Sequence, residues 1–232
     1  MVKNKVDVPD SAQPLSTGVS ISRQFLRSVR IDTDFGREDA LSGYVCQGTA
    51  KALLESMATQ IKDTRQRAFT WTGPYGGGKS SLALMLCSLV GPSPTLRKKA
   101  KSILNVPSDS PINAAFSSKE GGWLVLPLVG KRSSVTDELR NVLASHSNNL
   151  IKRKSKDHSD VIGELVSIAE AHPQGVLLVI DELGKFLESA ALEGDDVYFF
   201  QELAEAASRT NGRLVVVGIL HQAFDAYAAR LG

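Results

Sequence analysis

The sequence has 232 residues, of which 42% are hydrophobic and 22% are charged, and its formal net charge is +2. These values are typical of globular proteins and exclude a wholly disordered chain or a strongly basic nucleic-acid domain. Two cysteines indicate no disulfide framework, and no apolar run approaches the roughly 20 residues of a membrane span. The sequence begins with no signal peptide. We therefore expect a cytoplasmic, soluble protein.

The chain is interpreted as two parts. Residues 1–48 form an N-terminal arm and lead-in segment, because the first 20 residues are rich in Pro, Ser, Asp and Lys and lack periodicity. Residues 49–232 form the core domain, which opens with apolar residues at helical spacing up to Ile61. The segment 67–72 then predicts a short strand. The next apolar segment, residues 80–90, predicts a helix that is buried against a sheet.

Strands and helices are predicted to alternate through the rest of the core. Continuous apolar runs indicate buried strands, and apolar positions at helical spacing indicate helices. Strands are expected at residues 123–129, 176–180 and 214–220, and helices at residues 95–104, 135–145, 160–172, 196–209 and 222–230. Pro127 should confine its strand to a sheet edge. This alternation predicts an α/β fold with a mainly parallel central sheet in a three-layer α/β/α arrangement.

A glycine-rich segment between the first strand and its following helix matches the phosphate-binding Walker A pattern, G-x-x-x-x-G-K-[ST]. Glycines let successive N–H groups converge on phosphate oxygens, and the following helix presents its positive end to the same anion. Lys79 would reach the β- and γ-phosphates, and the Ser80 hydroxyl would ligate Mg²⁺. The predicted nucleotide-binding residues are Gly73, Pro74, Tyr75, Gly76, Gly77, Gly78, Lys79, Ser80 and Ser81.

A second motif, of the Walker B type, is a hydrophobic strand that ends in two acids, Asp181 and Glu182. We expect Asp181 to hold Mg²⁺ through water and Glu182 to act as the general base that polarises the attacking water. Taken alone, the segment would also fit a buried strand followed by a solvated acidic turn. Beside the phosphate loop, it predicts an ATPase that hydrolyses the β-γ phosphoanhydride bond of ATP.

These paired motifs resemble the P-loop ATPases of the additional-strand, catalytic-glutamate division, among them AAA+ and STAND-like ATPases. Residues 68–75 and 220–224 are further similar to the N-terminal ATPase regions of large multidomain bacterial proteins, some of them in phage defence or DNA transactions. The resemblance spans about residues 69–222. It implies that the strand after the two acids lies between the strands carrying the motifs. It also implies a catalytic sensor at that strand's tip, His221 or Gln222, although a capped helix start fits the same residues.

The sequence also departs from the pattern of that family. The stretch between Lys79 and Asp181 is longer than a minimal AAA+ core needs, and we attribute the excess to insertions at residues 95–122 and 145–159. The resemblance implies another strand, an arginine finger and a helical lid after the sensor strand. In that part of the sequence, Arg230 is the sole candidate for the arginine finger. We therefore expect a core that lacks the last strand and the lid, and that belongs to a longer protein.

Two functions remain open at this point. The first is a Mg²⁺-dependent ATPase that couples nucleotide state to attached domains or neighbouring subunits, and Glu182 favours it. The second is a nucleotide-gated switch or scaffold with little turnover, which would not need that glutamate. Two basic clusters, at residues 97–101 and 152–156, could contact nucleic-acid phosphates, but such runs are more often solvated helical faces.

Overall fold

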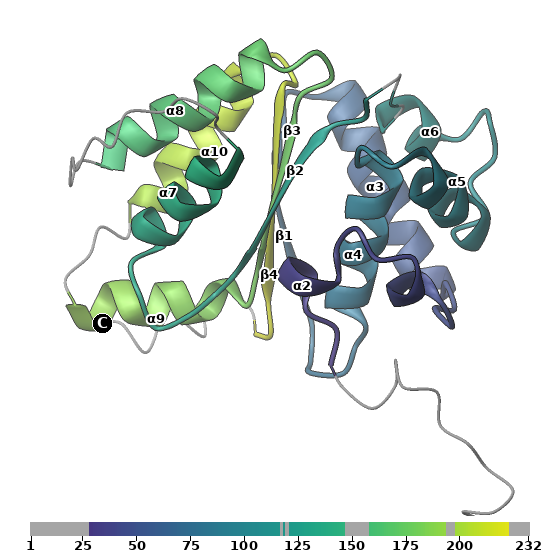
Figure 1. Cartoon of the computed structure of the whole chain (residues 1–232), viewed down its shortest axis with the longest axis horizontal. Coiled ribbons are helices and arrows are strands. Elements are labelled where there is room, and N and C mark those ends of the chain that lie inside the picture. The colour runs from purple at the N-terminus through teal and green to yellow at the C-terminus, as the bar shows by residue number, and fades with distance from the viewer. Residues whose placement is uncertain (1–27, 117, 119–120, 147–157, 194–197, 223–232) are drawn as a thin grey trace, which may run out of the picture.

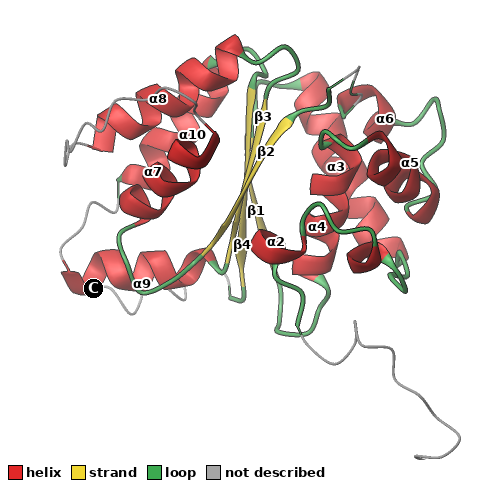
Figure 2. Ribbon diagram, in the orientation of Figure 1, coloured by secondary structure: helices red, strands yellow, loops and turns green. Residues whose placement is uncertain are grey.

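The computed structural model describes residues 28–116, 118, 121–146, 158–193 and 198–222. Within these residues, a four-stranded sheet lies between two layers of helices, so the predicted three-layer α/β/α fold is confirmed (Figures 1 and 2). The strands are β1 (Ala68–Thr72), β2 (Leu124–Val129), β3 (Val176–Asp181) and β4 (Leu214–Leu220). Their order across the sheet is β1-β4-β3-β2, and all neighbouring pairs are parallel.

This strand order positions the site. β4 lies between β1 and β3, as the family resemblance implied, and β2 is the edge strand on which Pro127 was expected. Because the strands are parallel, their carboxyl ends meet at one edge of the sheet. Thr72 pairs with Leu220 and Val129 pairs with Asp181, so the segments that follow all four strands leave the sheet close together.

The helices divide between the two faces of the sheet (Figure 1). One face carries α2 (Ile31–Asp34), α3 (Gly48–Asp63), α4 (Lys79–Val90), α5 (Pro94–Ile103) and α6 (Pro111–Ala115). The other carries α7 (Val135–His146), α8 (His158–Ala171), α9 (Leu183–Glu193) and α10 (Phe199–Arg209). A single 3-10 turn, Asp39–Leu41, follows α2 in the lead-in segment.

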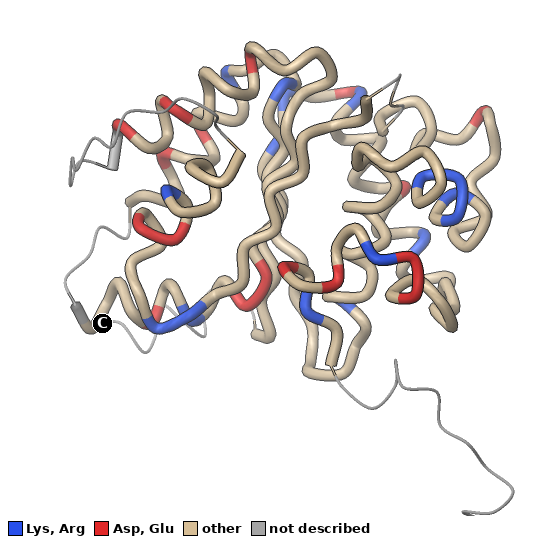
Figure 3. Tube along the Cα trace, in the orientation of Figure 1, with Lys and Arg blue, Asp and Glu red and all other residues tan. Residues whose placement is uncertain are grey.

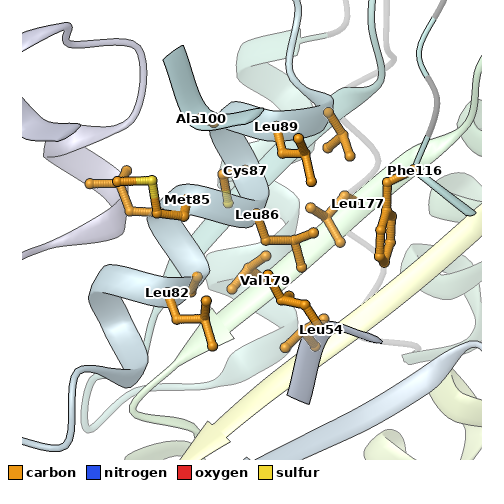
Figure 4. Packing of buried hydrophobic residues seen from close by; sticks show 14 of the residues in the cluster. Leu54, Leu82, Met85, Leu86, Cys87, Leu89, Ala100, Phe116, Leu177 and Val179 are labelled. Carbon is orange, nitrogen blue, oxygen red and sulfur yellow. The ribbon is translucent and has the colours of Figure 1, made fainter. Parts of the chain in front are cut away.

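Alternate residues of the central strands supply two separate hydrophobic cores. On β3, Leu177 and Val179 pack into the core shared with α4, whereas Leu178 and Ile180 pack on the opposite face. Both faces of the strand are buried, which explains its uninterrupted apolar sequence. Figure 4 shows α4 side chains gathered against those of β3 and α3, in agreement with the helix predicted to be apolar nearly all round.

Most predicted elements are present, with boundaries that differ by at most three residues. α9 was not predicted, because the acidic doublet was interpreted as the end of a strand and Gly184 lies in the first turn of the helix that follows it. The lead-in segment, left without predicted elements, contributes Ile31 and Leu41 to the core beside α4, and both side chains are fully buried. The arm at residues 1–20 and the basic cluster at 152–156 lie outside the described residues, as do Arg230 and all of the expected helix at 222–230 after its first residue.

Two further expectations can be compared with the described part of the chain. Its helices include none with the length and apolar character needed to cross a membrane. In the basic cluster on α5, Arg97 donates to the carbonyl of Gly91 at 2.6 Å, Lys99 to that of Glu38 at 2.6 Å and Lys101 to the Asn113 side chain at 2.8 Å. These cations hold neighbouring segments of the chain together, which agrees with a structural role for the cluster.

Candidate functional site

The phosphate loop runs from the end of β1 to the first turn of α4, the strand–loop–helix context that the motif requires. Gly76 and Gly78 have φ angles of 74° and 78°, a region in which residues with a side chain are strained. Gly78 also caps the N-terminus of α4, and its carbonyl accepts the first helical hydrogen bond from Leu82 at 2.9 Å. The loop therefore presents its backbone at the positive end of a buried helix.

Lys79 folds back over this loop. Its Nζ donates to the carbonyl oxygens of Gly73 at 2.6 Å and Pro74 at 2.7 Å. Burial lowers the pKa of the Lys79 ammonium, and the negative charge of Asp181 opposes that shift. A phosphate that enters the loop would give the ammonium a charged acceptor in place of two carbonyls, and hydrogen bonds to charged groups are the stronger kind.

Ser80 and Asp181 come together across the gap between α4 and β3. Asp181 is 3% exposed, and burial raises the pKa of its carboxyl group, while hydrogen bonds from the Ser80 side chain and the Glu182 backbone oppose the rise. The Glu182 N–H donates to Asp181 Oδ1 at 2.9 Å. This all-oxygen pair fits Mg²⁺, which takes one or two protein ligands and completes its shell with phosphate and water. A cation there would also offset the cost of a buried carboxylate.

Glu182 occupies a constrained turn at the carboxyl end of β3. Its φ is 51°, an unusual value for a residue with a side chain. The side chain forms an ion pair with Lys185, one turn further along α9, and the Lys185 N–H donates to the Glu182 carbonyl at 3.0 Å. Gly130, just after β2, donates its N–H to the Asp181 carbonyl at 2.7 Å. The two acids are thus held from both sides.

His221 brings the tip of β4 into the same site. Its ring stacks on Tyr75 of the phosphate loop, with centroids 3.6 Å apart and an interplanar angle of 18°. Burial lowers the pKa of His221, the charge of Lys79 lowers it further, and Glu182 and Asp181 oppose the change. The lowered pKa favours the neutral imidazole, and neither ring nitrogen has a hydrogen-bond partner within the described residues.

The structure thus places the predicted residues of three strand ends in one region. Lys79, Ser80, Asp181, Glu182 and His221 lie together, while Ser81 lies in the first turn of α4 and Gln222 is exposed after the tip of β4. Sequence reasoning missed the Lys185 pairing with Glu182, which an i, i+3 spacing would have indicated had α9 been predicted. It also missed Gly130, whose close approach to the acids has no signature in the sequence.

Comparisons with known proteins add little to this geometry. No protein-family model matches the chain, and no curated protein matches it. A search of solved structures finds C. elegans PCH-2, with a TM-score of 0.40 and 14% identity, over 84% of this chain and 44% of that one. The chain thus spans less than half the length of that neighbour. A likeness this distant does not bear on activity, which has to be inferred from the site itself.

Proposed function

We propose that the chain binds ATP with Mg²⁺ at residues 73–80 and hydrolyses the β-γ phosphoanhydride bond. The observation that carries the proposal is the meeting of Lys79, Ser80, Asp181 and Glu182 at the carboxyl edge of the sheet. Phosphoryl transfer to water requires a positively charged hydrogen-bond donor, a pair of oxygen ligands for a metal ion and a second carboxylate. They come from two segments about 100 residues apart, the start of α4 and the end of β3, and they converge only in the folded chain.

Each group has a defined task in this reaction. The loop N–H groups and Lys79 bind the phosphates and neutralise their charge. Ser80 with Asp181 would hold Mg²⁺, which would supply further charge stabilisation to the phosphates. Glu182 accepts a proton from the attacking water while the water oxygen forms a bond to the γ-phosphorus. The bond from that phosphorus to the bridging oxygen breaks, and ADP leaves with the electron pair. His221, among these charges, is proposed as the sensor of the terminal phosphate.

The strand order supports the finer assignment to the additional-strand, catalytic-glutamate division, of AAA+ or STAND-like type, because β4 separates β1 from β3. On this proposal the protein is a cytoplasmic, bacterial P-loop ATPase. Nucleotide state would be transmitted to attached domains or neighbouring subunits, and bacterial defence and DNA transactions are the proposed settings. The helices α2, α3, α5 and α6 share a hydrophobic core with α4, the helix that follows the phosphate loop, and are the part of the described chain best placed to respond to nucleotide.

A second candidate function, a nucleotide-gated switch with little turnover, is favoured by one specific contact. Lys185 pairs with Glu182, and this ion pair holds the carboxylate of the proposed base at the start of α9. If this pair persists when nucleotide is bound, the site would hold ATP without cleaving it. The ATPase requires instead that Glu182 turns toward the water when the phosphates arrive.

Phosphate release distinguishes the two functions. With excess ATP and Mg²⁺, the ATPase should release many phosphates per chain. Omitting Mg²⁺ should stop the release. Saturable binding of ATP with less than one phosphate released per chain over an hour would favour the switch and contradict the ATPase.

A further inference from the structure

Tyr75, in the middle of the phosphate loop, covers the imidazole of His221. The two rings are nearly parallel, and their centroids lie 3.6 Å apart. Tyr75 is 76% exposed, whereas both ring nitrogens of His221 are buried. The tyrosine ring thus turns one face to the imidazole while most of its own surface remains in contact with water.

The buried nitrogens of His221 are the unusual feature of this pair. A neutral imidazole carries one N–H donor and one acceptor, and neither nitrogen has a hydrogen-bond partner within the described residues. A buried polar atom without a partner costs free energy, and proteins keep such atoms mainly where they have a catalytic or binding role. The contact with Tyr75 is face to face, so it holds the ring without using either nitrogen.

The pairing of β1 with β4 places this stack beside the proposed phosphate site. The last residues of the two strands are paired, so Gly73 and His221 leave the sheet side by side. The Lys79 ammonium binds the Gly73 carbonyl at 2.6 Å. Figure 3 shows acidic and basic residues gathered at the lower end of the sheet, where β1 and β4 end. A phosphate held by Lys79 would therefore lie beside the imidazole.

The side chain of Tyr75, and not its backbone, makes this contact. The positive φ angles of the loop belong to its glycines, and Tyr75 is not among the residues with positive φ. The Gly77 N–H donates to the Pro74 carbonyl at 3.3 Å, which closes the turn around Tyr75 without its ring. Alanine at position 75 should therefore keep the fold of the loop and remove the stack alone.

We propose that Tyr75 is a positioning residue, which holds the His221 imidazole so that a ring N–H is directed at the terminal phosphate of bound ATP. This inference rests on the proposed function and deepens it. Stacking restricts the imidazole to few rotamers and leaves its edge free to donate to a phosphate oxygen. Hydrogen bonds to charged oxygens are stronger than those between neutral groups. The ring of Tyr75 has this task, and its hydroxyl group has none.

Proton NMR of the imidazole tests the contact itself. Protons above the face of an aromatic ring are shielded, so the His221 ring signals should move downfield when Tyr75→Ala removes the stack. His221→Ala identifies these signals among those of the four histidines. Tyr75→Phe should keep the upfield position, both in the free protein and with a non-hydrolysable ATP analogue and Mg²⁺. If the signals keep their place in Tyr75→Ala, the rings do not stack and the inference is wrong.

A double-mutant cycle tests what the contact does, with kcat and nucleotide affinity measured for each variant. Tyr75→Ala should lower kcat by about 10²-fold, the loss that a displacement of about 1 Å can cause, and should weaken the preference for the ATP analogue over ADP. Tyr75→Phe should recover most of both. In the His221→Ala background, Tyr75→Ala should have little further effect, because the two side chains act as a unit. Tyr198→Ala, at an equally exposed tyrosine before α10, should stay within about twofold of wild type.

Each other result decides against the inference. If Tyr75→Ala keeps its kcat and its analogue preference within about twofold of wild type, Tyr75 does not position His221. Losses that multiply in the double variant would show that Tyr75 acts on the nucleotide directly, and a Tyr75→Phe variant as slow as Tyr75→Ala would assign the effect to the hydroxyl group. If wild type binds nucleotide without releasing phosphate, the proposed hydrolysis fails, and the analogue preference still decides the role of Tyr75. If wild type binds no nucleotide, both proposals are wrong.

Discussion

Replacing Glu182 with glutamine is expected to lower ATP turnover by about 10²- to 10⁴-fold, the usual contribution of a general base. Glutamine keeps the shape of the side chain but cannot accept the proton of the attacking water. ATP affinity should change by no more than a few-fold, because Lys79, Ser80 and Asp181 bind the phosphates without it. The variant should therefore hold uncleaved ATP, measured as nucleotide retained after rapid gel filtration.

Glu170→Gln is the matched control, since it removes the same charge from an exposed position on α8. It should hydrolyse ATP at the wild-type rate. If Glu182→Gln releases phosphate as fast as this control, Glu182 is not the base. The acidic doublet would then be a solvated turn after a buried strand.

Substituting Gly130 with alanine is expected to disturb both stability and turnover. A Cβ at this position would lie 2.1 Å from the Glu182 carbonyl oxygen, a backbone atom that cannot move without moving the turn of the two acids. Forcing an atom into a packed position costs about 1–3 kcal/mol of unfolding free energy. Displacing a catalytic group by about 1 Å can cost 10²-fold in rate. Chemical denaturation should show the lower free energy of unfolding, and phosphate release should show the lower rate of turnover.

Gly163→Ala is the matched control, and it is expected to raise stability rather than lower it. Gly163 lies in α8, and a Cβ there would meet no atom within 4 Å. Alanine should stabilise the helix by about 0.5–1 kcal/mol and leave turnover unchanged. A Gly130→Ala variant that unfolds and turns over like wild type would mean that the β2 end does not support the acids as described.

The sequence predicted the layered fold and the strand ends of the site because both depend on local patterns. Continuous apolar runs marked β3 and β4, and the glycine loop with its lysine is a contiguous motif whose spacing reflects phosphate geometry. The order of the strands came from the family resemblance, since no local signal in β4 says which neighbours it takes. α9 was missed because the acidic doublet was interpreted as the end of a strand and the residues directly after it were given no element.

Contacts between distant segments could not be predicted in this way. The stack of Tyr75 on His221 joins the loop after β1 to the tip of β4, and only the parallel pairing of those strands brings the rings together.

The central claim is that residues 73–80 bind the phosphates of ATP, and a calorimetric titration with ATP in Mg²⁺ tests it most directly. Wild type should bind one ATP per chain, and Lys79→Ala should weaken that binding by at least about tenfold, since it removes a charged hydrogen bond worth roughly 1.5–3 kcal/mol. Lys62→Ala, at the end of α3, should bind as wild type does. Absence of binding by wild type, or equal affinity of wild type and Lys79→Ala, would contradict the account.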